Sequence, residues 1–233
     1  MGRVRIVGEL EPYIVMQKPG GKIKMRRLLA LLCLFSSPAW AEGRAGAFDY
    51  YVLSLSWSAN WCALEGDARN SPQCDPAEDF DWVLHGLWPQ YERDYPANCP
   101  SAQRPPSRAQ TAAMADIMGT SGLAWYQWNK HGVCSGLTAT QYFDTARAAF
   151  DSVVRPEVLR RVTGDITLPA HVVEEAFLRD NPQLTADQIT ITCKQGYIQE
   201  ARICLTRDLE PRECGADVIR DCTLDDALLT PMR

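Results

Sequence analysis

Hydrophobic and polar residues alternate in several short stretches of the chain, a pattern typical of strands that bury one face. Residues 51–57 read YVLSLSW and predict one strand, and residues 81–87 predict a second, shorter one. Residues 188–194 and 197–206 alternate in the same way, with only a Gln-Gly pair between them. The pattern therefore predicts two paired strands near the C-terminus and two further strands near the beginning.

Longer amphipathic stretches between these strand regions predict helices. The predicted helices are residues 109–118, 123–132, 139–154 and 168–178. Gly119 closes the first, and Pro169 lies in the first turn of the last, where the N–H that proline lacks costs little. The polar, proline-containing stretch 90–108 is expected to be a loop.

The order of these elements predicts the fold class. Helices gathered between strand regions, without a regular strand-helix repeat, favour an α+β fold over a doubly wound parallel sheet. We expect a central, mainly antiparallel sheet with helices packed around it. The chain shows no internal repeat, low-complexity linker or break in composition, so residues 42–233 are interpreted as one domain.

The N-terminal segment has the layout of a secretory signal peptide. Residues 25–41 read MRRLLALLCLFSSPAWA, with two arginines, an apolar run and small residues at the determining positions before a cut after Ala41. The apolar run is far shorter than the roughly 20 residues that span a bilayer, so no membrane anchor is expected. Residues 1–24 form a long basic leader, and either translation starts at Met25 or the signal has an extended basic region.

Removal of this leader changes the meaning of the cysteine count. The chain has nine cysteines, and Cys33 lies within the leader. An even number in a secreted chain predicts disulfides, and eight cysteines allow four bridges in 105 pairings. No C-x-x-C motif occurs, and no histidine stands at zinc-ligand spacing from a cysteine or another histidine, so no metal site is expected.

Charge limits the type of partner. The leader holds seven Lys/Arg and two Asp/Glu, which leaves 17 basic and 27 acidic residues after cleavage and a net charge of about −10. Such a chain is a poor candidate for tight, non-specific binding of nucleic acid. A nucleic acid would have to be held by a local site.

Two segments carry candidate chemistry: His85-Gly-Leu-Trp-Pro-Gln90 at the end of a predicted strand, and residues 126–134, YQWNKHGVC, on a predicted helix. Gln127 is four residues from His131 and three from Lys130, so an amide, an ammonium group and an imidazole can share one helix face. This face offers a proton-transfer group beside a fixed positive charge. It suits a reaction that builds negative charge on a phosphate.

HGLWPQ, followed some 40 residues later by W-x-K-H-G-x-C, resembles the two active-site segments of the ribonuclease T2 family, the transferase-type acid endoribonucleases. The similarity extends from about Phe48 to Cys222. It includes the Leu-Ser-Trp strand with Cys62 soon after, the Asn98-Cys99-Pro100 loop and the C-terminal strand with Thr192 and Cys193, with Glu200 to Cys204 beyond it.

The resemblance implies roles for the matching residues. His131 would be the general base that takes the proton of the ribose 2′-hydroxyl, and His85 the acid that protonates the leaving 5′-oxygen. The sequence alone leaves this assignment of acid and base open. Lys130 would stabilise the anionic phosphorane. The product would be a 2′,3′-cyclic phosphate, later hydrolysed to a 3′-phosphate.

Two positions depart from the pattern common in the family, where the second segment begins His-Glu. Tyr126 replaces the histidine and can still donate a hydrogen bond to phosphate. Gln127 replaces the glutamate, and an amide cannot raise the pKa of a neighbouring histidine as a carboxylate can. We therefore expect retained activity with a weaker electrostatic contribution and a shifted pH profile.

The resemblance also implies base-binding residues. Trp88 matches an aromatic platform on which a base stacks with little dependence on base identity. Gln90 stands where some relatives carry an aspartate that reads adenine, which leaves the base preference open. Trp82 and Trp128 are expected in the core. The remaining histidine, His171, is expected at the surface and outside the site.

The disulfide pairing implied by the resemblance joins Cys99 to Cys134, which would hold the loop after the first segment against the catalytic helix. The other implied pairs are Cys62 with Cys74, Cys193 with Cys222, and Cys204 with Cys214.

The sequence thus predicts a secreted or periplasmic, monomeric endoribonuclease that needs no cofactor or metal, acts on single-stranded RNA with low base specificity, and does not use DNA. A catalytically weakened relative that binds RNA or signals is the main alternative, because of Gln127. A metal-dependent phosphodiesterase is a more distant alternative, because the clusters of carboxylates and histidines that it needs are absent from the sequence.

Overall fold

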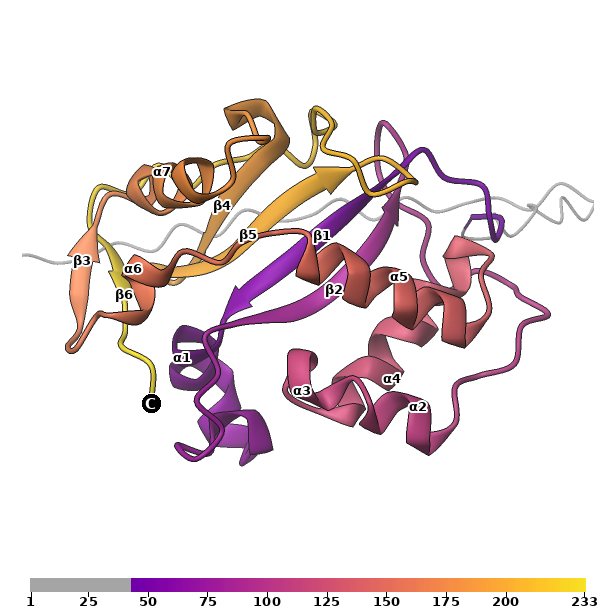
Figure 1. The fold of residues 1–233 in the computed structure, drawn as a ribbon, viewed down its shortest axis with the longest axis horizontal. Helices are drawn as coiled ribbons and strands as arrows, with labels where there is room; N and C mark the ends of the chain where they lie inside the picture. Colours follow the sequence, from indigo (N-terminus) through magenta and orange to yellow (C-terminus); the bar gives the residue numbers. More distant parts are fainter. Residues whose placement is uncertain (1–42) are drawn as a thin grey trace, which may run out of the picture. The chain divides into compact units, whose positions relative to one another are not determined.

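The computed structural model describes residues 43–233. This part of the chain forms one β-sheet with helices beside it (Figure 1). The predicted signal peptide, its cut after Ala41, the start at Met25 and Cys33 lie outside the described residues. No helix in the described part of the chain is long and apolar enough to cross a membrane.

Six strands form the sheet, and their bounds are β1 (Tyr50–Trp57), β2 (Trp82–Gln90), β3 (Ile166–Leu168), β4 (Ile189–Lys194), β5 (Tyr197–Leu205) and β6 (Ala227–Leu229). The order is β2-β1-β5-β6-β3, and β4 also pairs with β5. Every pairing is antiparallel except the single parallel contact of β5 with β6. The predicted α+β class with a mainly antiparallel sheet is therefore confirmed.

Seven α-helices lie in the described residues: α1 (Ser58–Trp61), α2 (Arg108–Ala112), α3 (Ala115–Met118), α4 (Ser121–Lys130), α5 (Ala139–Asp151), α6 (Glu157–Arg160) and α7 (Ala170–Asp180). Helix α7 lies beside β4, and α4 and α5 lie beside β2 (Figure 1); all three helices contribute residues to one hydrophobic core. Two short turns also bear on the site, the π-helical η1 (Cys62–Gly66) and the 3₁₀-helical η4 (Gly132–Ser135).

Several predicted boundaries are wrong by a few residues. The predicted helix 109–118 is divided into α2 and α3. The carbonyl of Ala113 accepts a hydrogen bond from the Arg147 side chain (2.7 Å) and not from a backbone N–H of the following turn. The helix predicted to reach residue 132 ends at Lys130. Leu168 ends β3, so α7 begins only at Ala170, and β2 continues past residue 87 to Gln90.

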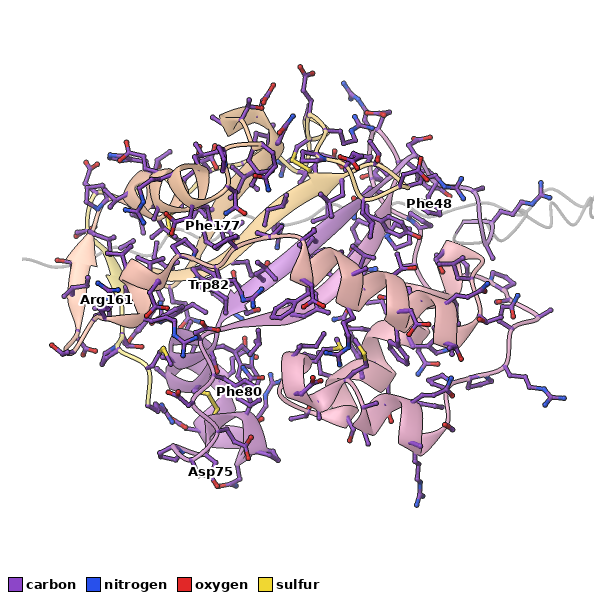
Figure 2. The ribbon with its side chains drawn as sticks, in the orientation of Figure 1. Phe48, Asp75, Phe80, Trp82, Arg161 and Phe177 are labelled. Carbon is purple, nitrogen blue, oxygen red and sulfur yellow. A yellow bond between two sulfur atoms is a disulfide. The ribbon has the colours of Figure 1, made fainter. Side chains whose placement is uncertain are left out.

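The two faces of the sheet differ. Tyr51, Leu53, Leu55 and Trp57 of β1 point into the main hydrophobic core, which α5 and α7 also enter. Trp82 belongs to this core and meets Phe177 of α7 edge-on, with ring centroids 5.2 Å apart (Figure 2). The opposite face of β1 contributes residues to a second, smaller cluster and to the candidate site.

Four disulfides join Cys62 to Cys74, Cys99 to Cys134, Cys193 to Cys222 and Cys204 to Cys214. This is the pairing that the family resemblance implies. The Cys99–Cys134 bridge connects the loop after β2 to η4, immediately beyond α4. The backbone N–H of Asn98 also donates to the carbonyl of Lys130 at 2.8 Å, so this loop is held to the end of α4 at two points.

Candidate active site

A cleft lies over the edge of the sheet where β2 faces α4. It consists of two adjoining hollows of about 500 and 800 Å³, and His85 and Tyr126 line both of them. The smaller hollow is lined by the two predicted segments, by β5 and by the loop after β2. Its lining includes His85, Trp88, Gln90, Tyr95, Tyr126, Gln127, Lys130, His131 and Arg202.

His85 occupies a β-bulge in β2. Gly86 pairs with Ser54 and Leu84 pairs with Leu55 of β1, so His85 is the extra residue between two paired neighbours. A bulge interrupts the alternation of side chains and redirects the side chain that it contains. The simple strand alternation that predicted residues 81–87 contains no sign of this irregularity.

The imidazole of His85 is held from the adjoining part of the sheet. Its Nδ1 lies 2.5 Å from Oε1 of Glu200 on β5. Arg202 donates to the other oxygen, Oε2, through Nε (2.8 Å) and Nη2 (2.6 Å). Burial by itself would raise the pKa of Glu200, but the hydrogen bond from His85 and the charges of His85 and Arg202 outweigh it and lower the pKa well below its ordinary value.

The opposite wall of the cleft comes from the last turn of α4. The Thr120 hydroxyl caps the start of this helix by accepting from the N–H of Leu123 (3.0 Å). The helix ends at Lys130, and His131 follows as its C-cap. Gly132 comes next because a Cβ there would lie 2.7 Å from the Trp128 ring and 2.9 Å from the Tyr142 ring, both in the core.

His131 is largely buried, with 4% of its surface exposed. Burial, reinforced by the positive charge of Lys130 and by His85, lowers the pKa of His131 to about 3. Within residues 43–233, its Nδ1 has no hydrogen-bond partner. The two histidines of the cleft therefore differ, because one is paired with a carboxylate and the other is kept neutral.

Trp88 connects the two predicted segments. Its Nε1 donates a hydrogen bond to Oε1 of Gln127 (2.8 Å). The indole stacks on His131, with ring centroids 5.3 Å apart, and meets His85 edge-on at 5.2 Å. Gln127 is almost fully buried, and its Nε2 has no partner among the described residues. The N–H groups of Gln127 Nε2 are thus available to donate a hydrogen bond to a ligand.

Positive charge and aromatic rings surround the mouth of the cleft. Nζ of Lys130 lies 5.9 Å from the ring centroids of both Tyr95 and Tyr126. Tyr126 is 53% exposed, and the guanidinium of Arg202 lies 5.4 Å from the Trp88 ring centroid. The cleft can therefore accept an anionic group next to flat, apolar rings.

All seven predicted site residues line one hollow, namely His85, Trp88, Gln90, Tyr126, Gln127, Lys130 and His131. Gln90 is buried at the end of β2, and His171 is exposed on α7, away from the cleft. Sequence reasoning missed Tyr95, Glu200 and Arg202. For Glu200 a signal existed, because a glutamate at a buried position of an alternating strand needs a partner.

Two further observations concern the chemistry of the described residues. Within residues 43–233, no group of three or more His, Cys, Asp or Glu side chains is arranged to hold a metal ion. Trp82 and Trp128, expected in the core, are each 1% exposed.

Comparison with known proteins identifies the family to which the chain belongs. The sequence pattern of the ribonuclease T2 family matches residues 48–214, and the chain belongs to this family. It is 39% identical over 127 residues to a ribonuclease of Aeromonas hydrophila, covering 52% of this chain and 56% of the relative. It is 30% identical over 146 residues to Ribonuclease 1 of Arabidopsis thaliana, covering 52% and 61%. The chain spans about half the length of the curated relatives it matches.

Solved structures show the same fold at lower sequence identity. An RNase-related protein from Calystegia sepium matches with a TM-score of 0.61 and 19% identity, over 79% of this chain and 97% of that one. RNase NT in complex with 5′-AMP matches with a TM-score of 0.59 and 20% identity, over 80% and 100%.

Proposed function

We propose that this protein is an endoribonuclease that cleaves single-stranded RNA by attack of the ribose 2′-hydroxyl on the adjacent phosphate. One observation carries the proposal: two imidazoles line a single cleft beside Lys130, one bonded to a carboxylate and the other buried and neutral. Acid and base catalysis by a pair of histidines requires that the two rings have different environments.

The environments of the two histidines support an assignment of their roles. His131, with its pKa lowered to about 3, is neutral at mildly acidic pH and accepts the proton of the 2′-hydroxyl. The 2′-oxygen forms a bond to phosphorus, and the bond from phosphorus to the 5′-oxygen breaks. His85, whose Nδ1 is bonded to Glu200, acts as the general acid and gives its proton to the leaving 5′-oxygen. The products are a 2′,3′-cyclic phosphate and a free 5′-hydroxyl.

Three side chains from α4 are suited to the phosphate. Lys130 provides the positive charge for the anionic phosphorane, and the free Nε2 of Gln127 can donate to a phosphate oxygen. Tyr126 lines both hollows and can donate its hydroxyl there. In a later step, water attacks the cyclic phosphate in the reverse sense and yields a 3′-phosphate.

Bases on either side of the scissile phosphate would occupy the two hollows. Trp88, with Tyr95 beside it, offers aromatic surface for stacking, which tolerates different bases and favours low base specificity. Gln90 is buried in the same hollow and can hydrogen-bond to a base edge. DNA is not a substrate in this scheme, because it lacks the attacking 2′-hydroxyl.

The cellular setting belongs to the same proposal. We infer residues 42–233 as one catalytic domain, secreted to the periplasm or the medium as a monomer after removal of the leader. Four disulfides support an oxidising compartment. Similarity to the ribonucleases of Aeromonas hydrophila and Haemophilus influenzae, and to Ribonuclease I of Escherichia coli, supports activity on RNA.

The test is to incubate the purified protein with RNA, and separately with DNA of the same sequence, in excess chelator. We expect RNA fragments with 2′,3′-cyclic phosphate ends, detected by mass spectrometry, and intact DNA. His85→Ala and His131→Ala should each abolish the cleavage. Failure of the unmutated protein to cut RNA would favour a binding or signalling role, and cleavage lost only with chelator would favour a metal-dependent phosphodiesterase.

A further inference from the structure

We infer that Glu200, itself held by Arg202, is a positioning residue that orients His85 for its role as general acid. This inference rests on the proposed ribonuclease function and adds to it a pair of residues outside the two active-site segments. Glu200 lines the larger hollow and not the one that contains His131 and Lys130, and both of its carboxylate oxygens are engaged by His85 and Arg202, so it acts through His85.

The geometry leaves Glu200 little freedom. The residue is 1% exposed, and each carboxylate oxygen has its own partner, His85 on Oε1 and Arg202 on Oε2. A carboxylate so enclosed and bonded on both sides holds a fixed direction, unlike an exposed ion pair. With Nδ1 of His85 engaged, Nε2 is the nitrogen left to face the cleft.

Local features of three strands create this contact. β1 lies between β2 and β5, and its residue Ser56 pairs with Glu200 while Ser54 pairs with Arg202 and Gly86. Serine side chains are short, so Glu200 can reach across β1 to His85. The bulge at His85 directs the imidazole toward this contact. The pairing of β5 with β4 is also irregular beside Glu200. Thr192 pairs with Glu200 and Cys193 pairs with Ile198, so Gln199 has no partner on β4.

Glu200 also provides a carboxylate that the catalytic helix lacks. Position 127 is an amide in this chain. Among the described residues, Glu200 is the carboxylate that bonds directly to an imidazole of the cleft. The other titratable groups that interact with His85 are His131, the residue after α4, and Glu65 of η1. Glu65 is engaged by Lys194 and Arg69, which leaves Glu200 as the carboxylate partner of His85.

The test compares two substrates that differ in their need for an acid. A dinucleoside monophosphate releases a 5′-alkoxide, which must be protonated as it leaves. A nucleoside 3′-(4-nitrophenyl phosphate) releases 4-nitrophenolate, which needs no proton. General acid catalysis contributes about 10²- to 10⁴-fold to the rate. We expect Glu200→Gln to remove part of this contribution and to lower kcat on the dinucleoside about 10- to 100-fold. KM should change little, and the aryl substrate should react within about twofold of the unmutated rate.

Two variants complete the design. Glu175→Gln makes the same chemical change at an exposed position of α7 and should leave both substrates unaffected. Glu200→Asp keeps the negative charge beside Arg202, which protects the fold, but its side chain is one methylene shorter and loses the bond to His85. It should show the same selective loss. Cleavage of the aryl substrate also verifies that each variant is folded.

Equal loss on both substrates by Glu200→Gln and Glu200→Asp would overturn the inference, because it would show a general structural role. Unchanged kcat on the dinucleoside would overturn it as well. Failure of the proposed function has a different signature, in which the unmutated protein forms no cyclic phosphate from either substrate.

Discussion

Nε1 of Trp88 donates a hydrogen bond to Oε1 of Gln127 across 2.8 Å, and this bond joins the two sequence segments that carry the proposed chemistry. The two residues are 39 positions apart, one on an edge strand and one on a helix. The bond fixes the side-chain amide so that its oxygen is occupied and its Nε2 is free. An amide at this position thus has a structural partner and a donor for phosphate.

Gln127→Glu should keep the bond to Trp88 but change the dependence of activity on pH. A carboxylate accepts from Nε1 as the amide does, so we expect the fold to be retained. Its negative charge would raise the pKa of nearby His131 from about 3 and move the acidic limb of kcat/KM to higher pH. Rates measured from pH 3 to 8 test this. An unchanged rate and profile would contradict the role assigned to Gln127.

Gly86→Ala should disrupt the same bond by steric exclusion. A Cβ at Gly86 would overlap Nε1 of Trp88 and Oε1 of Gln127, so one of these side chains would have to move. Overpacking of this kind costs about 1 to 3 kcal/mol, and we expect at least a tenfold loss of kcat/KM with a lower melting temperature. Gly164→Ala is the matched control, because nothing lies within 4 Å of a Cβ there. Equal behaviour of the two variants would argue against this prediction.

Lys130→Ala should remove about 2 to 4 kcal/mol of transition-state stabilisation, or about 30- to 1000-fold in kcat/KM, by analogy with lost oxyanion donors. The acidic limb should also move to higher pH, since the charge of Lys130 helps to lower the pKa of His131. Lys130→Arg keeps a positive charge and should lose less. The measurement is a pH–rate profile of all three proteins, and a Lys130→Ala variant with normal kcat/KM would refute the assigned role.

Glu174→Gln should stabilise the protein at alkaline but not at acidic pH. Burial and the carboxylates of Asp221 and Glu175 raise the pKa of Glu174 from 4.5 to about 7. The folded state therefore binds a proton more tightly than the unfolded chain, and the associated stability is lost as pH rises through this window. We expect a higher Tm than the unmutated protein at pH 8 and an equal Tm at pH 4.5. Glu78→Gln, at an exposed glutamate, should change neither.

Removal of the Cys99–Cys134 bridge should affect both stability and catalysis. The bridge closes a loop of 35 residues, and loop entropy assigns it about 4 kcal/mol, against about 3 kcal/mol for Cys204–Cys214, which closes 10. Paired serine variants of each bridge can be compared by urea unfolding and by kcat. Only the first pair should lower kcat markedly, since it holds the loop after β2 to the end of α4. A larger loss of kcat from the second pair would contradict this.

Local pattern was sufficient for much of the fold. The alternation around Leu53 and Leu55 identified β1, because one face of that strand carries apolar residues of the main core and the other carries the buried serines Ser54 and Ser56. Helical spacing alone was enough to place Gln127, Lys130 and His131 close together. The predicted helix over 109–118 was wrong, because Arg147, more than 30 residues away, binds the carbonyl that a continuous helix would use.

The sequence by itself determined which chemical groups are present and which of them lie near one another on a single element. Only the tertiary structure decided how these groups are tuned. The bulge at His85, the carboxylate of Glu200 brought to it from 115 positions along the chain, and the burial of His131 all depend on strand register and packing. Proton affinity responds to the charges and solvent around a group in space, and neither can be obtained from the order of residues.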